Sequence, residues 1–261
     1  LARVTVLDVS LDQNREALQT LLQAGAQVEY FDHHHAGVLP EHSGLRALID
    51  TAAEVCTSIL VDRHLGGARR PWAVAGAFGD NLARAARALG ASLDLDAAAW
   101  ARLQELGESI NYNAYVDDEA DLIVHPADLF RTLVRYTDPL VVIDNEAVVR
   151  RIRDTRAEDL TQAADLRPLA QWDGGRVFLL PDLPWSRRVR GAWGNHLVHD
   201  APSLAHAVLS PASAGGFVVS VRAPLERLQG ADALCRQFPT GGGRAAARSE
   251  ERRVGKECRL T

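Results

Sequence analysis

Val28-Glu29-Tyr30-Phe31-Asp32-His33-His34 is the stretch that decides the fold, because it is a short apolar run closed by an acidic residue and two histidines. Such a run predicts a buried β-strand over residues 28–31. Residues 4–7 predict another buried strand, which ends at Asp8, and residues 72–78 predict a third, which is followed by Asp80. Each of the three predicted strands therefore ends in a carboxylate.

Helical patterns separate these predicted strands. Leucines at helix spacing share one face over residues 18–22, with a cap predicted at Ser10 or Asp12 and a left-handed residue predicted at Gly25. A second helix is predicted over residues 55–64, closed by two glycines. Strands that alternate with helices predict an α/β fold with a parallel sheet.

The remainder of the chain divides into a helical part and a second, smaller domain. Residues 81–136 carry Ala, Leu and Arg at helix spacing and predict a helical flank to the sheet. Residues 144–169 are rich in charge and predict an exposed helical connector. Strand-like residues 177–180 and 217–221, separated by turn signals, predict a second α/β or α+β domain.

The carboxyl ends of parallel strands share one edge of a sheet, so Asp8, Asp32 and Asp80 are predicted to converge. Three carboxylates without a counter-charge repel one another, and a bound cation is the best explanation of such a site. His33 and His34 add imidazole donors, and this mixed set suits Mn²⁺, Fe²⁺ or Zn²⁺ better than Ca²⁺. A single strand-end aspartate is more often a helix cap, so it is the combination that favours a metal site.

Phe31-Asp32-His33-His34-His35 resembles the Asp-His-His signature of the DHH phosphoesterases. The similarity extends to Asp8, at the end of the preceding predicted strand, and to Gly79-Asp80, which follow a later one. Residues 216–222 and the run Gly241-Gly242-Gly243-Arg244 resemble the substrate-binding domain associated with that family. The resemblance therefore extends over both predicted domains, and the ordered combination is more specific than any one motif.

The resemblance implies a division of the chain and a role for each matched residue. The implied parts are a DHH catalytic domain over residues 1–140, a helical linker over 141–172, a substrate-binding domain over 173–247 and an atypical tail over 248–261. Asp8 then bridges two Mn²⁺ ions, with Mg²⁺ as the alternative metal, and His33 and Asp80 ligate one of them. Asp32 orients a histidine, and His34 faces the substrate phosphate. The implied substrate-binding residues are Arg222, Gly241, Gly242, Gly243 and Arg244.

Two departures from the family's pattern bear on activity. The family's first motif, an Asp-x-Asp on an upstream strand, would lie before Leu1, so the chain as given is expected to lack ligands for both metals, which would leave it inactive. Arg244 stands where many relatives carry histidine after the three glycines. Residues 248–261 differ in composition from the rest, either as a solvated charged terminus or as a truncated or foreign tail.

The residues and the resemblance together predict a phosphoesterase that cleaves phosphodiester bonds in short oligonucleotides or small nucleotides by a two-metal mechanism. The net charge of -5 argues against a protein that coats long nucleic acid, which needs a broadly basic surface. An exopolyphosphatase or pyrophosphatase is the alternative within enzymes, and an inactive nucleotide-binding regulatory relative is the alternative outside them. No membrane segment is predicted, a cytoplasmic location follows by default, and a homodimer is an open alternative.

Overall fold

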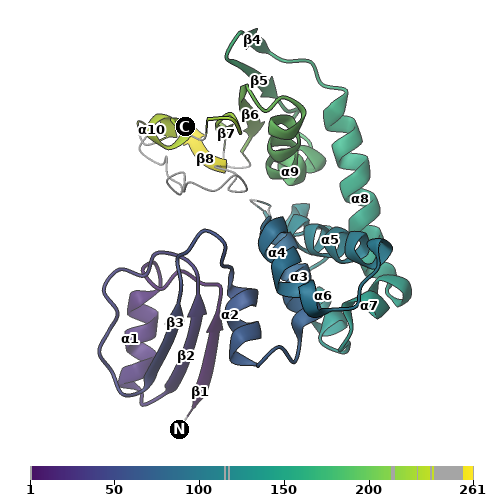
Figure 1. Ribbon diagram of the computed structural model, residues 1–261. Helices are drawn as coiled ribbons and strands as arrows, with labels where there is room; N and C mark the ends of the chain where they lie inside the picture. The colour runs from purple at the N-terminus through teal and green to yellow at the C-terminus, as the bar shows by residue number, and fades with distance from the viewer. Residues whose placement is uncertain are drawn as a thin grey trace. The chain divides into compact units, whose positions relative to one another are not determined.

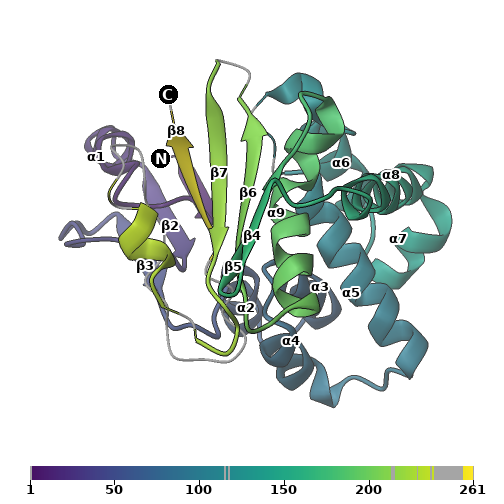
Figure 2. The ribbon, with the colours of Figure 1, turned by 90° about the horizontal axis from the view of Figure 1, so that it is seen from above.

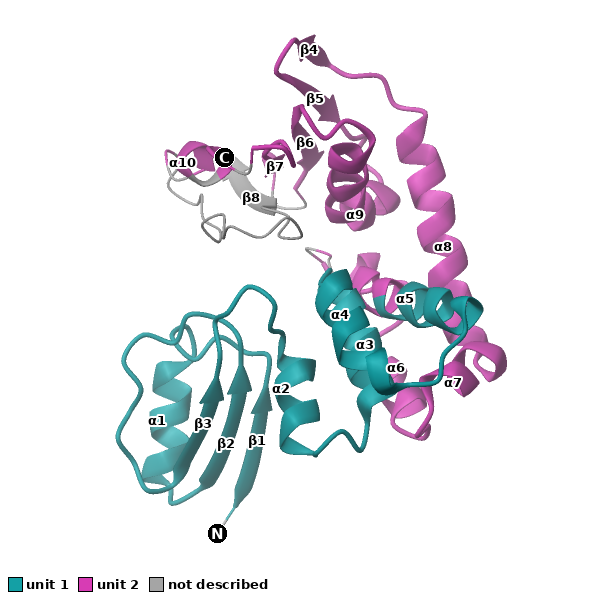
Figure 3. Ribbon diagram, viewed as in Figure 1, with its two compact units in different colours: residues 1–107 teal, residues 108–261 magenta. Residues whose placement is uncertain are grey.

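The computed structural model describes residues 2–114, 116, 118–212, 215–227, 229–235, 237 and 255–260, the last of these as backbone only. Figure 1 shows the course of the chain, which divides into two compact units, residues 1–107 and residues 108–261 (Figure 3). The boundary falls within helix α5 (Ala97–Tyr112). The functional domains that the sequence predicts divide the chain at other places, and their limits stay a prediction.

Unit 1 is built on a three-stranded parallel sheet in the order β1-β2-β3 (Figure 1). In this sheet Leu7 lies opposite Phe31, and Phe31 lies opposite Leu48. The α/β class and the parallel sheet that the sequence predicts are confirmed. The prediction of a buried first strand is wrong, because β1 is an edge strand whose residues are half-buried or exposed. The strands are β1 (Arg3–Leu7), β2 (Gln27–Asp32) and β3 (Leu45–Ile49).

The two faces of this sheet are covered by separate apolar clusters. Helix α1 (Arg15–Gln23) buries Leu18 and Leu22 together with Val28 and Tyr30 of β2. Side chains of successive strand residues point to opposite faces, so Phe31 belongs to the other face. There it packs with Val55, which precedes α2 (Thr57–His64), and with Leu60 of that helix.

The chain on either side of α1 sets the ends of that helix. Gly25 has a left-handed φ of 79°, as predicted. The predicted caps at Ser10 and Asp12 are wrong, because the helix begins after Asn14. Residues 10–14 form a turn instead, in which the Asn14 N–H donates to the carbonyl of Ser10.

The third predicted strand is wrong, because residues 72–78 belong to helix α3 (Arg70–Gly79). Pro71 lies in the first turn, where a helix tolerates proline. Gly76 faces α2 so closely that an added Cβ would come within 2.7 Å of the Ser58 hydroxyl. A short run of small apolar residues fits a buried strand and a buried helix equally well, and close helix packing is what distinguishes them. The third strand is β3, which the sequence pattern did not indicate.

Helices follow from residue 83 onward, as the predicted helical flank requires. Two of them begin with proline after a side-chain acceptor: His125 accepts from the Ala127 N–H, and Asp138 accepts from the Leu140 N–H. None of the helices in the described ranges combines the length and the apolar character that a membrane crossing requires. Besides α5, these helices are α4 (Ala83–Leu89) and η1 (Gly90–Ser92) in unit 1, and η2 (Glu119–Asp121), α6 (Pro126–Leu133), α7 (Pro139–Asn145) and α8 (Ala147–Ala164) in unit 2.

Unit 2 carries a five-stranded mixed sheet in the order β4-β5-β6-β7-β8 (Figure 2). β5 and β6 run parallel, and the other neighbouring pairs run antiparallel. Helix α9 (Pro184–Asp200) covers the sheet and buries Trp193 against Phe178 and Val208. The strands predicted at residues 177–180 and 217–221 are present as β5 and β7. The strands are β4 (Ala170–Trp172), β5 (Gly175–Leu179), β6 (Ala205–Pro211), β7 (Phe217–Arg222) and β8 (Gly255–Leu260), and a short helix, α10 (Ala231–Cys235), lies between the last two.

A buried histidine in this sheet makes the stability of unit 2 depend on pH. His206 on β6 is 1% exposed, and burial lowers the pKa of its ring below the usual 6.5. The unfolded chain takes up a proton on His206 as the pH falls through its ordinary pKa, whereas the folded protein resists it. The unfolded state then binds more protons, so the free energy of unfolding declines on acidification.

We expect His206→Gln to flatten this decline between about pH 7.5 and about pH 5, where the unfolded histidine titrates. The measurement is the free energy of unfolding by urea at a series of pH values. His35→Gln, at an exposed position of unit 1, is the control and should keep the wild-type slope. A His206→Gln protein with the same pH slope as wild type would contradict the assignment.

Candidate metal centre

Asp8 and Asp32 lie at the carboxyl ends of two neighbouring parallel strands. Asp8 directly follows β1, and its N–H donates to the carbonyl of Phe31 at 3.0 Å, while Asp32 is the last residue of β2. The backbone of Asp8 has a φ of 60°, in the left-handed region that aspartate tolerates better than most residues. Such conformations cluster at functional sites. Two of the three predicted carboxylates therefore meet at the sheet edge.

Asp80 reaches the same place from the end of a helix, not from the end of a strand. It follows the last residue of α3, and the next residue, Asn81, has a left-handed φ of 65° that turns the chain. Its Oδ2 lies 3.7 Å from Nε2 of His33. The predicted approach of Asp80 to His33 is thus present, although the element that carries it was predicted wrongly.

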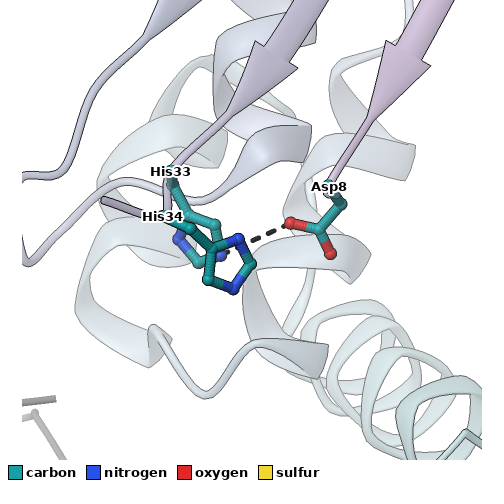
Figure 4. Close-up of side chains that lie close together, drawn as sticks. All are labelled: Asp8, His33 and His34. Carbon is teal, nitrogen blue, oxygen red and sulfur yellow. Dashed lines mark ion pairs between the residues drawn. The ribbon is translucent and has the colours of Figure 1, made fainter. Parts of the chain in front are cut away.

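His33 lies at the centre of the cluster that Figure 4 shows in close-up. Its Nε2 is 3.4 Å from Oδ1 of Asp8. One ligand atom each from Asp8, His33 and His34 fall within 4.8 Å of one another. The His33 ring is buried, whereas the Asp8 side chain is 60% exposed, so the cluster has one protein-lined side and one side open to water.

The hydrogen bonds of His33 determine which ring nitrogen faces the carboxylates. Nδ1 lies 3.0 Å from the carbonyl oxygen of Val55. A carbonyl oxygen only accepts, so Nδ1 carries the proton, and in the neutral ring Nε2 presents a lone pair. That lone pair faces Asp8 and Asp80 at 3.4 and 3.7 Å, longer than a good N–H···O hydrogen bond.

A shared cation fits the group formed by Asp8, His33 and His34, whose ligand atoms lie within 4.8 Å of one another, and Asp80 approaches the same nitrogen of His33. Ligands held about 2.1 Å from one ion at tetrahedral or octahedral angles lie about 3.0–3.4 Å apart, close to the separations around His33 Nε2. The His33 orientation is the one that metal-ligating histidines adopt, with the second ring nitrogen donating to a carbonyl.

Asp32 is fully buried and contacts both histidines. Its Oδ1 accepts the backbone N–H of His33 at 2.8 Å and lies 2.7 Å from Nδ1 of His34. Nδ1 of His34 therefore carries the proton, and Nε2 is the nitrogen left for a ligand. These contacts are what the predicted orienting role of Asp32 requires. The division of roles, in which Asp80 binds metal and His34 binds phosphate, stays a prediction, because His34 also has a ligand atom within 4.8 Å of those of Asp8 and His33.

One contact at this site has no counterpart in the sequence motifs. Thr57, the first residue of α2, donates its hydroxyl to Oδ1 of Asp8 at 2.7 Å. The two residues are separated by 49 positions in the chain, and no spacing rule links them.

The predicted substrate-binding residues lie in unit 2. Arg222 ends β7 and is buried, with its Nε donating to Oδ1 of Asn195 at 3.0 Å and one Nη donating to the Ser220 hydroxyl at 2.7 Å. These contacts hold its guanidinium against α9 and β7. Its role toward substrate stays a prediction. The other predicted residues, Gly241, Gly242, Gly243 and Arg244, lie outside the described residues.

No protein-family model and no curated protein matches the chain. Among solved structures, it is similar to a DHH-domain protein described as a member of a family of ribosomal proteins, with a TM-score of 0.57 and 15% identity. That match covers 98% of this chain, which spans 65% of the other protein's length. A pGpG-specific phosphodiesterase from Vibrio cholerae matches with a TM-score of 0.49 and 13% identity, over 100% of this chain and 93% of that one.

The similarity to the DHH-domain protein concerns the fold. It extends over nearly the whole chain, both units included, at an identity too low to carry over residue roles. The chain therefore has the fold of a DHH-domain protein, as the Asp-His-His signature and its companion motifs predict.

Proposed function

We propose that the protein is a Mn²⁺-dependent phosphoesterase that hydrolyses phosphodiester bonds in short oligonucleotides or small nucleotides. The observation that carries the proposal is the environment of His33, whose lone-pair nitrogen faces two carboxylates at the end of a parallel sheet. The DHH-type fold supports it, since the same residues match that family's motifs.

The residues of the site divide into those that would hold a cation and those that would handle the phosphate. Asp8, His33 and Asp80 are the candidate ligands of a first ion. A bound divalent ion would polarise a phosphoryl oxygen and lower the pKa of bound water. The donors described here suffice for one such ion, and the two-ion arrangement is part of the proposal.

His34 is the candidate contact for the substrate phosphate. It is partly exposed, and its Nδ1 is held by Asp32 at 2.7 Å. When His34 is protonated, Nε2 can donate to a phosphate oxygen while the Asp32 carboxylate stabilises the positive charge. Asp32 is well suited to this task because it is fully buried and already accepts the His33 N–H, which fixes its own orientation.

The net charge of the protein favours short substrates over long ones. The net charge of -5 gives little affinity for a long polyanion, whose binding relies on many phosphate contacts from Lys and Arg. A dinucleotide carries few phosphates, and one or two metal ions with a few donors neutralise them locally.

The test combines Mn²⁺ binding by the chain as given with turnover by a chain that also carries the Asp-x-Asp motif expected upstream of Leu1. Calorimetric titration with Mn²⁺ should show saturable binding and give its stoichiometry, and the extended chain loaded with Mn²⁺ should cleave pGpG, a dinucleotide with one phosphodiester bond, in preference to long duplex DNA. EDTA should abolish cleavage. Mn²⁺ binding without cleavage of pGpG would favour a regulatory protein, and cleavage of pyrophosphate or polyphosphate alone would favour the inorganic alternative. Either result would contradict the proposal.

A further inference from the structure

We infer that Thr57 is a positioning residue of the metal centre, whose hydroxyl holds the Asp8 carboxylate in the orientation that turns Oδ1 toward His33. The inference rests on the proposed metal-dependent function and deepens it, because it assigns a role to a residue that the motifs do not include.

The contact involves the oxygen that faces the histidine. Thr57 Oγ1 donates to Oδ1 of Asp8 at 2.7 Å, and the same Oδ1 lies 3.4 Å from Nε2 of His33. A carboxylate oxygen accepts in two lone-pair directions, so Thr57 occupies one of them and leaves the other for a cation. Oδ2 of Asp8 remains available for a second ligand contact.

Asp8 needs such a restraint because its own surroundings are loose. Its side chain is 60% exposed and stands after an edge strand. An exposed carboxylate samples several rotamers, and fixing it at the moment of metal binding costs conformational entropy. A hydrogen bond already made in the metal-free protein removes part of that cost, in the way that preorganised sites do.

Thr57 is a rigid donor. It is 7% exposed and lies in the first turn of α2, and a β-branched side chain in a helix has restricted χ1 freedom. From the other side, the Tyr30 hydroxyl donates to the carbonyl of Val9 at 2.7 Å and holds the chain just after Asp8. The backbone and the carboxylate of Asp8 are thus fixed by two separate buried donors.

Three substitutions separate the hydroxyl from the rest of the side chain. Thr57→Val keeps the shape and removes the donor, Thr57→Ser keeps the donor, and Thr57→Ala serves as a second variant should valine prevent folding. Thr20→Val is the matched control, since Thr20 donates to the Glu16 carbonyl on the exposed face of α1.

The measurement is the dissociation constant for Mn²⁺ by calorimetry, with the electron paramagnetic resonance spectrum of bound Mn²⁺ as a second readout. We expect Thr57→Val to weaken binding by about 10–100-fold, the range for residues that orient metal ligands, and to alter the spectrum. Thr57→Ser and Thr20→Val should keep wild-type affinity.

The outcomes separate the role of Thr57 from the proposed function on which it rests. Unchanged affinity in Thr57→Val or Thr57→Ala, with a wild-type protein that binds Mn²⁺, would overturn the role of Thr57 and leave the metal centre in place. Equal loss in Thr57→Val and Thr57→Ser would also overturn it, because the hydroxyl would then not be the cause. A wild-type protein that binds no Mn²⁺ would overturn the proposed function and the inference with it.

Discussion

His33→Ala is expected to lose Mn²⁺ affinity by more than about 100-fold, because removing a ligand should cost more than the 10–100-fold typical of a residue that only orients one. Its Nε2 is the atom common to two carboxylate contacts of the site, with Asp8 at 3.4 Å and with Asp80 at 3.7 Å. In the His33→Ala protein, Asp8 and Asp80 lose the imidazole nitrogen that both of them face. Calorimetric titration of the two proteins with Mn²⁺ measures the change directly.

His34→Ala should behave differently if its task is the phosphate. We expect turnover of pGpG to fall on the order of 100-fold, as for other donors aimed at developing charge, with most of the Mn²⁺ affinity kept. His35→Ala, at the next and exposed position, is the matched control and should leave both quantities unchanged. Equal loss of metal in the His33 and His34 variants would refute the division of labour, and full activity in both would refute the catalytic role.

Within unit 1, the β1-α1-β2 part of the fold was predictable from period and composition. The strands over residues 4–7 and 28–31 are apolar and end at polar residues, and the helix between them shows its leucines at helix spacing. The stretch over residues 72–78 was not predictable in this way, because periodicity alone does not separate a short buried strand from a segment of a buried helix. In the structure α3 packs closely against α2 at Gly76, a tertiary contact that a local pattern does not contain.

The site was predictable where it follows a strand and unpredictable where it depends on packing. Asp8, Asp32 and the two histidines follow from the rule that parallel strands end at one edge. Asp80 was predicted to join them both as a third strand end and by its resemblance to a family motif. It does lie near His33, but it follows a helix, so the strand-end reason for its position was wrong. Thr57 carried no signal, because its contact with Asp8 joins residues 49 positions apart on different elements.

A buried ion-pair network in unit 2 was equally invisible in the sequence. Asp159 of α8 accepts the Tyr112 hydroxyl at 2.7 Å and two donors of Arg188, Nε at 2.8 Å and Nη2 at 3.1 Å. Burial and the hydrogen bond to Asp159 raise the pKa of Tyr112 well above its usual 10.0, so its hydroxyl stays a donor. Arg187, the residue before Arg188, makes a second bidentate ion pair, with Asp121. Within unit 2 the network ties α9 to α8, to the end of α5 and to η2.

Asp159→Ala is expected to lower the free energy of unfolding by about 3–5 kcal/mol, the cost of breaking a buried pair by removing one partner. Asp159 is 2% exposed and the Arg188 side chain only 14%, so water cannot take over the role of the carboxylate. Tyr112→Phe removes one hydrogen bond to a charged group and should cost about 1.5–3 kcal/mol. Asp154→Ala is the matched control, because its pair with Arg153 is solvent-exposed and worth about 1 kcal/mol or less. Urea unfolding measures the free energy of unfolding of all three variants. An Asp159→Ala protein as stable as the Asp154→Ala protein would show that the network stabilises the fold no more than a surface ion pair does.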